Sequence, residues 1–106
     1  MKEIALQKQI VEYLNYNKCF VWRNNAGMFF KEYKGKTHCL RAGVKGLSDI
    51  TGMTAYGVFI AIECKIKYNK PTKAQNDFLQ EVGSRGGIAF VAYSLDDVIK
   101  NIKNYL

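Results

Sequence analysis

Cysteine and histidine are scarce in this sequence, and their arrangement argues against two common kinds of site. The three cysteines, Cys19, Cys39 and Cys64, are an odd number and form no CxxC pair. Such a set predicts neither a disulfide framework nor a zinc site, so reduced thiols in a cytosol are expected. The single histidine, His38, cannot build a histidine-based metal site alone.

Long apolar runs are also missing. The longest one, Val58 to Ile62, ends at Glu63 and is far too short to cross a membrane. The first residues, Met1-Lys2-Glu3-Ile4, have neither the apolar stretch nor the cleavage site of a signal peptide. We therefore expect a soluble cytoplasmic protein with no membrane partner.

The overall composition is typical of one small, basic, folded domain, which we expect to cover residues 1–106. Apolar residues make up 48% and aromatics 13%, which is enough for a core and argues against disorder. Sixteen Lys and Arg against nine Asp and Glu give a net charge of +7. This balance indicates a polyanionic partner, of which nucleic acid is the commonest, although charge alone does not exclude a merely soluble basic protein.

Hydrophobic periodicity and turn signals predict the order of the elements. Residues 3–16 form an amphipathic helix in this prediction, with Leu6, Ile10, Tyr13 and Leu14 on one stripe. Further along the chain we expect a short β-prone run at 19–22, a turn or loop at 23–27, a hairpin of 29–33 with 37–40, and strands at 50–54 and 58–66.

In the C-terminal part, the sequence pattern predicts a helix, a strand and a second helix. Thr72 and Gln75 have the spacing of a capping box for a helix that Gly86-Gly87 ends. A buried strand follows at 88–93, and Ser94 caps a last helix over 95–106, with Leu106 among its inward residues. The order predicts an α/β fold with a mixed central sheet flanked by helices, in which 62–91 form a right-handed parallel crossover.

Three charged residues interrupt this apolar pattern. Asp49 lies at the start of one predicted strand, and Glu63 and Lys65 lie within the most apolar one. Counting outward from the tight turn at 55–57 places Asp49 and Glu63 level on adjacent strands, and alternation directs Glu63 and Lys65 to the same face. A lone buried charge costs several kcal/mol, on the order of the stability of a small domain, so something must compensate these charges.

Two carboxylates that converge on one point are typical of a Mg²⁺ or Mn²⁺ site. Such a metal activates water and neutralises charge in phosphodiester hydrolysis, and the Lys65 ammonium could orient the water or stabilise the added charge. Taken singly, Asp49 could be a turn residue, and Glu63 with Lys65 a surface pair on an edge strand. Taken together in a basic domain, they favour a catalytic site.

Asp49…Glu63-Cys64-Lys65 resembles the signature of PD-(D/E)XK nucleases. The flanking sequence is similar to the virus-type replication-repair nuclease (VRR-NUC) domain over nearly the whole chain. Ser48 stands where the signature has proline. The supporting blocks are Glu3 with Leu6-Gln7 and Ile10, Arg23-Asn24-Asn25-Ala26-Gly27, Gly46-Leu47-Ser48-Asp49, Ala61 to Lys65, Pro71-Thr72-Lys73-Ala74-Gln75, and Gly86-Gly87-Ile88-Ala89-Phe90-Val91.

The resemblance implies an αβββαβ restriction-endonuclease-like core and Mg²⁺-dependent cleavage of DNA, with Mn²⁺ as a substitute. For stand-alone copies, which are typical of phages and bacteria, it implies a homodimer that acts on branched DNA such as four-way (Holliday) junctions, in a bacterial cell or a phage-infected host. The process stays open between DNA repair, recombination and phage DNA processing. It also implies that Asp49, Glu63 and the Cys64 backbone carbonyl hold the metal. Lys65 would stand beside the attacking water, Glu3 would reach the metal or its waters, and Gln75 would support the site.

Two of these residues also have alternative, structural roles. Glu3 is an acid in the first turn of a helix, where the helix dipole favours it. Gln75 belongs to the capping box, and we expect its amide to serve either the cap or the site, not both. The Cys64 thiol should face the core.

Basic and aromatic residues provide candidates for DNA contact. Arg23, Asn25, Arg41, Lys45 and Lys73 could hold phosphates near the site, or could be a solvated basic surface. Tyr16, Phe29, Phe30 and Tyr33 could stack on unpaired bases or form a dimer surface.

The sequence thus predicts a metal-dependent endonuclease that selects DNA structure over sequence. The alternatives are a flap, single-strand or restriction-type nuclease, and a non-catalytic DNA-binding module of the same fold.

Overall fold

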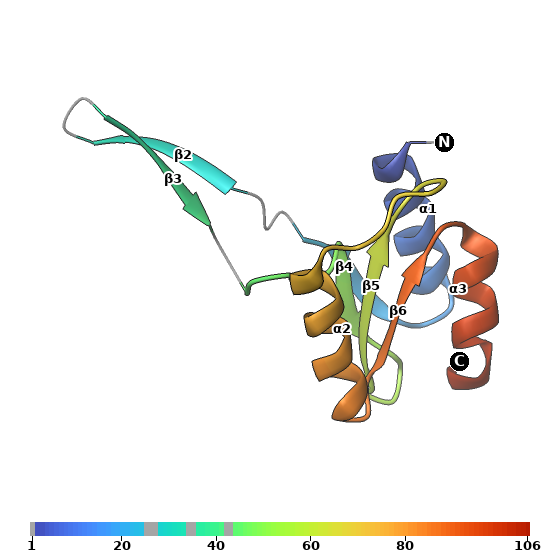
Figure 1. The fold of residues 1–106 in the computed structure, drawn as a ribbon. Coiled ribbons are helices and arrows are strands. Elements are labelled where there is room, and N and C mark those ends of the chain that lie inside the picture. Colours follow the sequence, from blue (N-terminus) through green and yellow to red (C-terminus); the bar gives the residue numbers. More distant parts are fainter. Residues whose placement is uncertain (1, 25–27, 34–35, 42–43) are drawn as a thin grey trace.

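The computed structural model describes residues 2–24, 28–33, 36–41 and 44–106, and the side chains of 2–24 and 44–106. Figure 1 shows the elements in chain order. They are α1 (Glu3–Tyr16), β1 (Phe20–Arg23), β2 (Met28–Tyr33), β3 (Lys36–Arg41), β4 (Ile50–Met53), β5 (Phe59–Cys64), α2 (Lys73–Ser84), β6 (Ile88–Ala92), α3 (Leu95–Ile102) and a 3₁₀ turn, Lys103–Tyr105.

The central sheet has the strand order β1-β4-β5-β6. β4 pairs antiparallel with both β1 and β5, whereas β5 and β6 are parallel and are joined through α2. β2 and β3 form a separate two-stranded sheet, inserted in the chain between β1 and β4. The fold is therefore α/β with a mixed sheet flanked by helices, as predicted, and it is compatible with an αβββαβ core.

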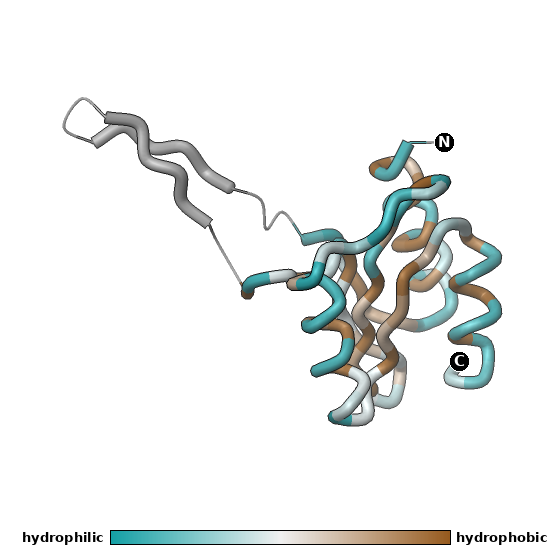
Figure 2. Tube along the Cα trace, in the orientation of Figure 1, coloured by the Kyte–Doolittle hydropathy of each residue, from teal (hydrophilic) through white to brown (hydrophobic). Residues whose placement is uncertain are grey.

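The helices cover the two faces of the sheet unequally. α1 packs on β1 and β5 and α3 packs on β6, while α2 packs on β5 and β6 from the opposite face. Figure 2 shows apolar residues along the central strands and hydrophilic residues on the outer turns of the helices. Among the described residues, no helix has both the length and the apolar character that a membrane span requires.

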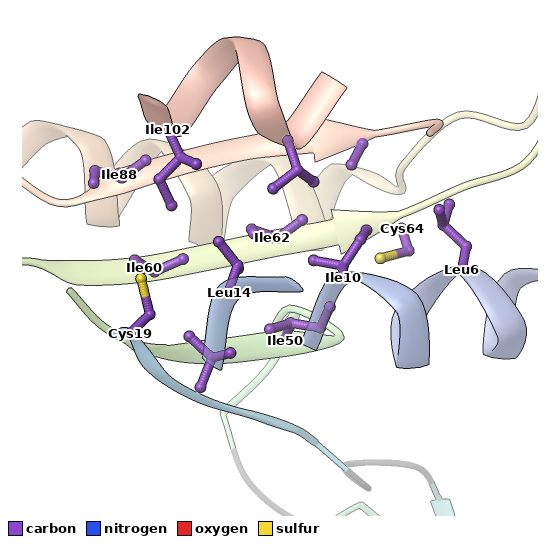
Figure 3. Close-up of a cluster of buried hydrophobic side chains, with 13 residues drawn as sticks. Leu6, Ile10, Leu14, Cys19, Ile50, Ile60, Ile62, Cys64, Ile88 and Ile102 are labelled. Carbon is purple, nitrogen blue, oxygen red and sulfur yellow. The ribbon is translucent and has the colours of Figure 1, made fainter. Parts of the chain in front are cut away.

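The core lies between the sheet and the layer of α1 and α3. Leu6, Ile10 and Leu14 form the apolar stripe of α1 and meet Ile60 and Ile62 of β5 (Figure 3). Each such side chain stabilises the fold by about 1.5–3 kcal/mol on burial. Figure 3 also shows Leu6 and Cys64 at one end of this cluster and Leu14 with Ile60 towards the other, so the start of α1 lies near the end of β5.

Most predicted boundaries differ from the observed ones by no more than one residue, but two predicted ends lie further off. β5 ends at Cys64 and not at Ile66, because the chain turns at Lys67, whose φ is +49°. The last helix ends at Ile102, tightens into a 3₁₀ turn, and leaves Leu106 44% exposed instead of inward. The end of the chain packs on too little apolar surface to hold another α-helical turn.

Candidate metal and catalytic site

Asp49 and Glu63 meet where β4 and β5 lie side by side. Asp49 directly precedes β4, and Ile50 pairs with Ile62, so Asp49 falls level with Glu63 on the same face. Asp49 Oδ2 accepts a hydrogen bond of 2.8 Å from the backbone N–H of Cys64. The structure thus brings together the two carboxylates that the sequence paired, on the face that α2 covers.

Glu63 is buried with half of its carboxylate unpartnered. Its exposed fraction is 1%, and Oε1 accepts a 3.1 Å hydrogen bond from Gln75 Nε2. Within the part of the chain that the structure describes, Oε2 has no hydrogen-bond partner. A buried acceptor without a partner costs roughly 1–3 kcal/mol, and more when it is charged, so a proton, a water molecule or a cation at this oxygen would stabilise the protein.

The pKa of Glu63 leads to the same conclusion. Burial is the largest cause that raises the pKa of Glu63, and repulsion from Asp49 and the hydrogen bond that a protonated Glu63 carboxyl can share with Asp49 act in the same direction. The charge of Lys65 acts against them, and the resulting pKa is about 8. Burial likewise raises the pKa of the Cys64 thiol, with added repulsion from Asp49, Glu63 and Glu3. The carboxylates of Asp49, Glu63 and Glu3 therefore all place negative charge near Cys64. Without a cation, Glu63 holds a proton at neutral pH.

The free energy of unfolding of the metal-free protein should therefore fall as pH rises. Between the ordinary pKa of 4.5 and the folded value of about 8, the unfolded chain releases the Glu63 proton and the folded chain keeps it. Each pH unit in this window then lowers stability by up to about 1.4 kcal/mol, and the loss levels off above it. Denaturant unfolding in chelator across this range measures the effect.

The matched control is Glu63→Gln, whose neutral amide does not titrate. Its stability should change less between these pH values than that of the wild type, and divalent cation should reduce the loss in the wild type. An equal pH dependence in the two proteins would contradict the assignment of the titration to Glu63.

Gln75 serves the cap and the site at once. Its Oε1 accepts the backbone N–H of Thr72 at 2.8 Å, and its Nε2 donates to Glu63. The expectation that one amide could not do both is wrong, because the two ends of the amide have different partners. The capping box therefore also orients a donor toward the buried carboxylate.

Asn24 is a positioning residue to which the sequence analysis assigned no role. Its backbone N–H donates to the Asp49 carbonyl at 2.8 Å, and its Nδ2 donates to the Ser48 carbonyl and to Thr51 Oγ1, each at 2.9 Å. Asn24 thus ties the end of β1 to the turn that carries Asp49. It stands in the Arg23-Asn24-Asn25 block, but nothing local distinguishes it from Asn25.

Cys64 and Lys65 follow Glu63 directly in the chain, whereas Glu3 lies near Cys64 and is not brought into a three-ligand cluster with Asp49 and Glu63 among the described residues. The Lys65 backbone N–H donates to Ala92 at 3.1 Å, which continues the parallel pairing one residue past β5. Glu3 opens α1, at the end of that helix that lies near Cys64 (Figure 3). Cys64 has a fully buried side chain in the core, as predicted.

Lys45 and Lys73, two of the predicted DNA contacts, come together. A Cβ at Gly46 would collide with the Ala74 carbonyl oxygen, and Gly46 has a φ of +74°, so the glycine allows the loop to lie against α2. Both lysines line a hollow of about 320 Å³ there, and Lys73 pairs with Asp77 at 2.9 Å.

Arg23 lies elsewhere. It pairs with Ile50 on the α1 face, and its Nε donates to Gln7 at 3.0 Å. Tyr16 is exposed at the C-terminal end of α1. The side chains of Asn25, Arg41, Phe29, Phe30 and Tyr33 lie outside the described residues.

The donor set fits a hard divalent cation. Among the described residues, no cluster of three or more His, Cys, Asp and Glu could hold a metal. Mg²⁺ does not need one, since it is usually bound by one or two carboxylates and keeps several waters. The unpartnered Glu63 Oε2 next to Asp49 is the acceptor that such a cation would satisfy.

Comparison with known proteins identifies no family. No protein-family model matches the chain, and no curated protein matches its sequence.

Proposed function

We propose that this protein is a Mg²⁺-dependent DNA endonuclease that selects branched DNA, such as a four-way junction, by structure. The observation that carries the proposal is the buried Asp49–Glu63 pair with Glu63 Oε2 unpartnered. The resemblance of Asp49…Glu63-Cys64-Lys65 to VRR-NUC nucleases adds the reaction and the substrate. The net charge of +7 adds an attraction to the phosphate backbone.

Each residue of the site has a role in this proposal. A divalent cation held by Asp49, Glu63 and the Cys64 carbonyl would supply an activated water and charge neutralisation at the phosphate. Lys65 stands beside that water and stabilises charge that develops on the phosphate. Gln75 fixes the Glu63 carboxylate, Asn24 fixes the turn of Asp49, and Glu3 reaches the metal-bound waters.

A homodimer is part of the proposal. Resolution of a four-way junction requires two cuts related by near two-fold symmetry, and a C2 dimer of the 12.1 kDa chain carries two equivalent sites. Lys45 and Lys73, together beside α2, are proposed phosphate contacts that position the strand without reading its sequence.

Cleavage should require a divalent cation and should favour branched DNA. Labelled linear duplex, flap and four-way junction of matched arm sequence are incubated with the protein, with Mg²⁺ and with chelator. We expect cutting of the junction in Mg²⁺ or Mn²⁺, none in chelator, and persistence of the preference when the arm sequences change. The cation supplies the hydroxide that two carboxylates cannot generate at neutral pH.

Robust cleavage in chelator would contradict the mechanism. Preferred cutting of flaps or single strands would keep the chemistry and replace the junction as the substrate. Tight DNA binding without cleavage in any metal would indicate a non-catalytic DNA-binding module.

A further inference from the structure

The face of the sheet that carries Asp49 and Glu63 continues into exposed aromatic residues. α2 covers this face over β5 and β6, and beyond it Phe20 and Trp22 of β1 are 65% and 40% exposed. Met53 of β4 and Phe59 of β5 are 37% and 40% exposed. We refer to Phe20, Trp22, Met53 and Phe59 as the open aromatic face.

Strand register places this face beside the carboxylates. Trp22 pairs with Thr51, which pairs with Ala61, and this row is two residues along the strands from Asp49 and Glu63. Phe20, Met53 and Phe59 form the next row. Because a strand rises about 3.3–3.4 Å per residue, the rows lie roughly 7 and 14 Å from the carboxylate row.

The two rings are held on a strand and connected to the site. They meet edge to face, with centroids 5.4 Å apart and planes at 60°. Trp22 Nε1 donates to Asn24 Oδ1 at 3.1 Å, and Asn24 in turn holds the turn of Asp49. The aromatic surface and the metal ligands are therefore parts of one hydrogen-bonded framework.

We propose that the open aromatic face stacks unpaired bases of the DNA strand whose phosphate reaches Asp49 and Glu63. This rests on the proposed nuclease function and adds to it a substrate with unpaired bases next to the cut. Aromatic side chains on a strand in a basic protein provide the two components of single-strand binding, a stacking surface and attraction to the backbone.

A second copy of the chain fits this face less well. Fully buried aromatic side chains contribute 150–250 Å² each, so these partly exposed residues offer roughly 400 Å² per copy. A stable interface buries about 800 Å² per partner. The net charge of +7 attracts DNA to the protein surface.

Trp22 is the only tryptophan of the chain, so its fluorescence tests the proposal directly. Single-stranded DNA, linear duplex, and a junction with unpaired bases at its branch are titrated into the protein in chelator, where no cleavage is required. We expect quenching of Trp22 emission and its protection from acrylamide by single strands and by the unpaired junction. Linear duplex should produce neither.

Variants measure the contribution by anisotropy of labelled DNA. Phe20→Ala and Trp22→Ala should weaken binding to the unpaired substrates about 5- to 100-fold and leave duplex binding unchanged. Tyr105→Ala, which removes an exposed ring in the 3₁₀ turn that follows α3, is the control. If Trp22→Ala unfolds, Trp22→Phe keeps a ring, and should bind unpaired substrates within a few-fold of the wild type.

DNA binding without a change in Trp22 emission, or with unchanged affinity in both alanine variants, would overturn the proposal. A dimer in sedimentation that Phe20→Ala converts to monomer would show that the face is an interface between copies. Cleavage without Trp22 quenching would support the nuclease function and overturn the stacking proposal. Quenching without cleavage in Mg²⁺ would support the stacking proposal and contradict the nuclease function.

Discussion

Asp49→Asn and Glu63→Gln should each reduce DNA cleavage in Mg²⁺ by more than about 100-fold. Loss of groups that merely support metal ligands commonly costs 10–100-fold, so loss of a carboxylate ligand should exceed that. Rates on the four-way junction, at saturating protein and with several Mg²⁺ concentrations, separate weakened metal binding from a lower rate. Each carboxylate is a separate ligand in the proposed site, so the remaining one cannot supply the metal-binding oxygen that the substitution removes.

The same two substitutions should leave the metal-free protein as stable as the wild type or more stable. Glu63→Gln mimics the protonated form that burial and Asp49 already favour, and its amide can still accept from Gln75. Asp49→Asn keeps an oxygen that can accept the Cys64 N–H. Near pH 8 in chelator, both variants should therefore unfold at a temperature no lower than that of the wild type.

Two exposed acids provide matched controls. Asp96→Asn in α3 and Glu12→Gln in α1 make the same chemical changes away from the pair and from the hollow of Lys45 and Lys73, and should alter neither cleavage nor the pH dependence of stability. If Asp49→Asn and Glu63→Gln both unfold while the controls do not, the carboxylates are structural and the proposed site is wrong.

Lys65→Met should lower the rate of the cleavage step by about 10²–10³-fold, the loss typical when one group that stabilises developing charge is removed. Methionine keeps an unbranched side chain of similar size and removes the ammonium, with its charge and its N–H donors. Binding of DNA in Ca²⁺ and binding of Mg²⁺ should change little, because the ammonium acts in the transition state. Single-turnover kinetics with the junction measure the rate of the step.

Lys100→Met, on the exposed face of α3, is the control for removal of one positive charge. An equal loss of DNA affinity and rate in Lys65→Met would make Lys65 a phosphate contact. Stability provides a second readout, because the Lys65 charge lowers the pKa of Glu63. In metal-free Lys65→Met, the decline of stability with rising pH should therefore extend to higher pH.

Local patterns predicted most of the elements because their signals are short-range. The stripe of Leu6, Ile10 and Leu14 predicted α1 over the residues that form it. Thr72 and Gln75 predicted the capping box. Sequence reasoning failed at the ends of β5 and α3, where packing and a positive φ at Lys67 decide the boundary.

The pairing of Asp49 with Glu63 could be predicted because only a tight turn separates their strands. Counting from that turn depends on strand alternation alone, which is a local property of the chain. The role of Asn24 and the double role of Gln75 could not be predicted in this way. Both depend on which atoms β1 and α2 bring to the turn of Asp49 and to Glu63.

The sequence by itself determined the α/β class, the order of most elements, and the placement of two acids at one point of the sheet. These follow from periodicity, turn residues and alternation, which act over a few neighbouring residues. Only the tertiary structure decided that Glu63 is buried with an unpartnered oxygen, that Arg23 faces α1, and that Phe20 and Trp22 remain open beside the site. Burial and hydrogen-bond partners belong to elements distant in the chain, and they exist only once α1 and α2 pack on the sheet.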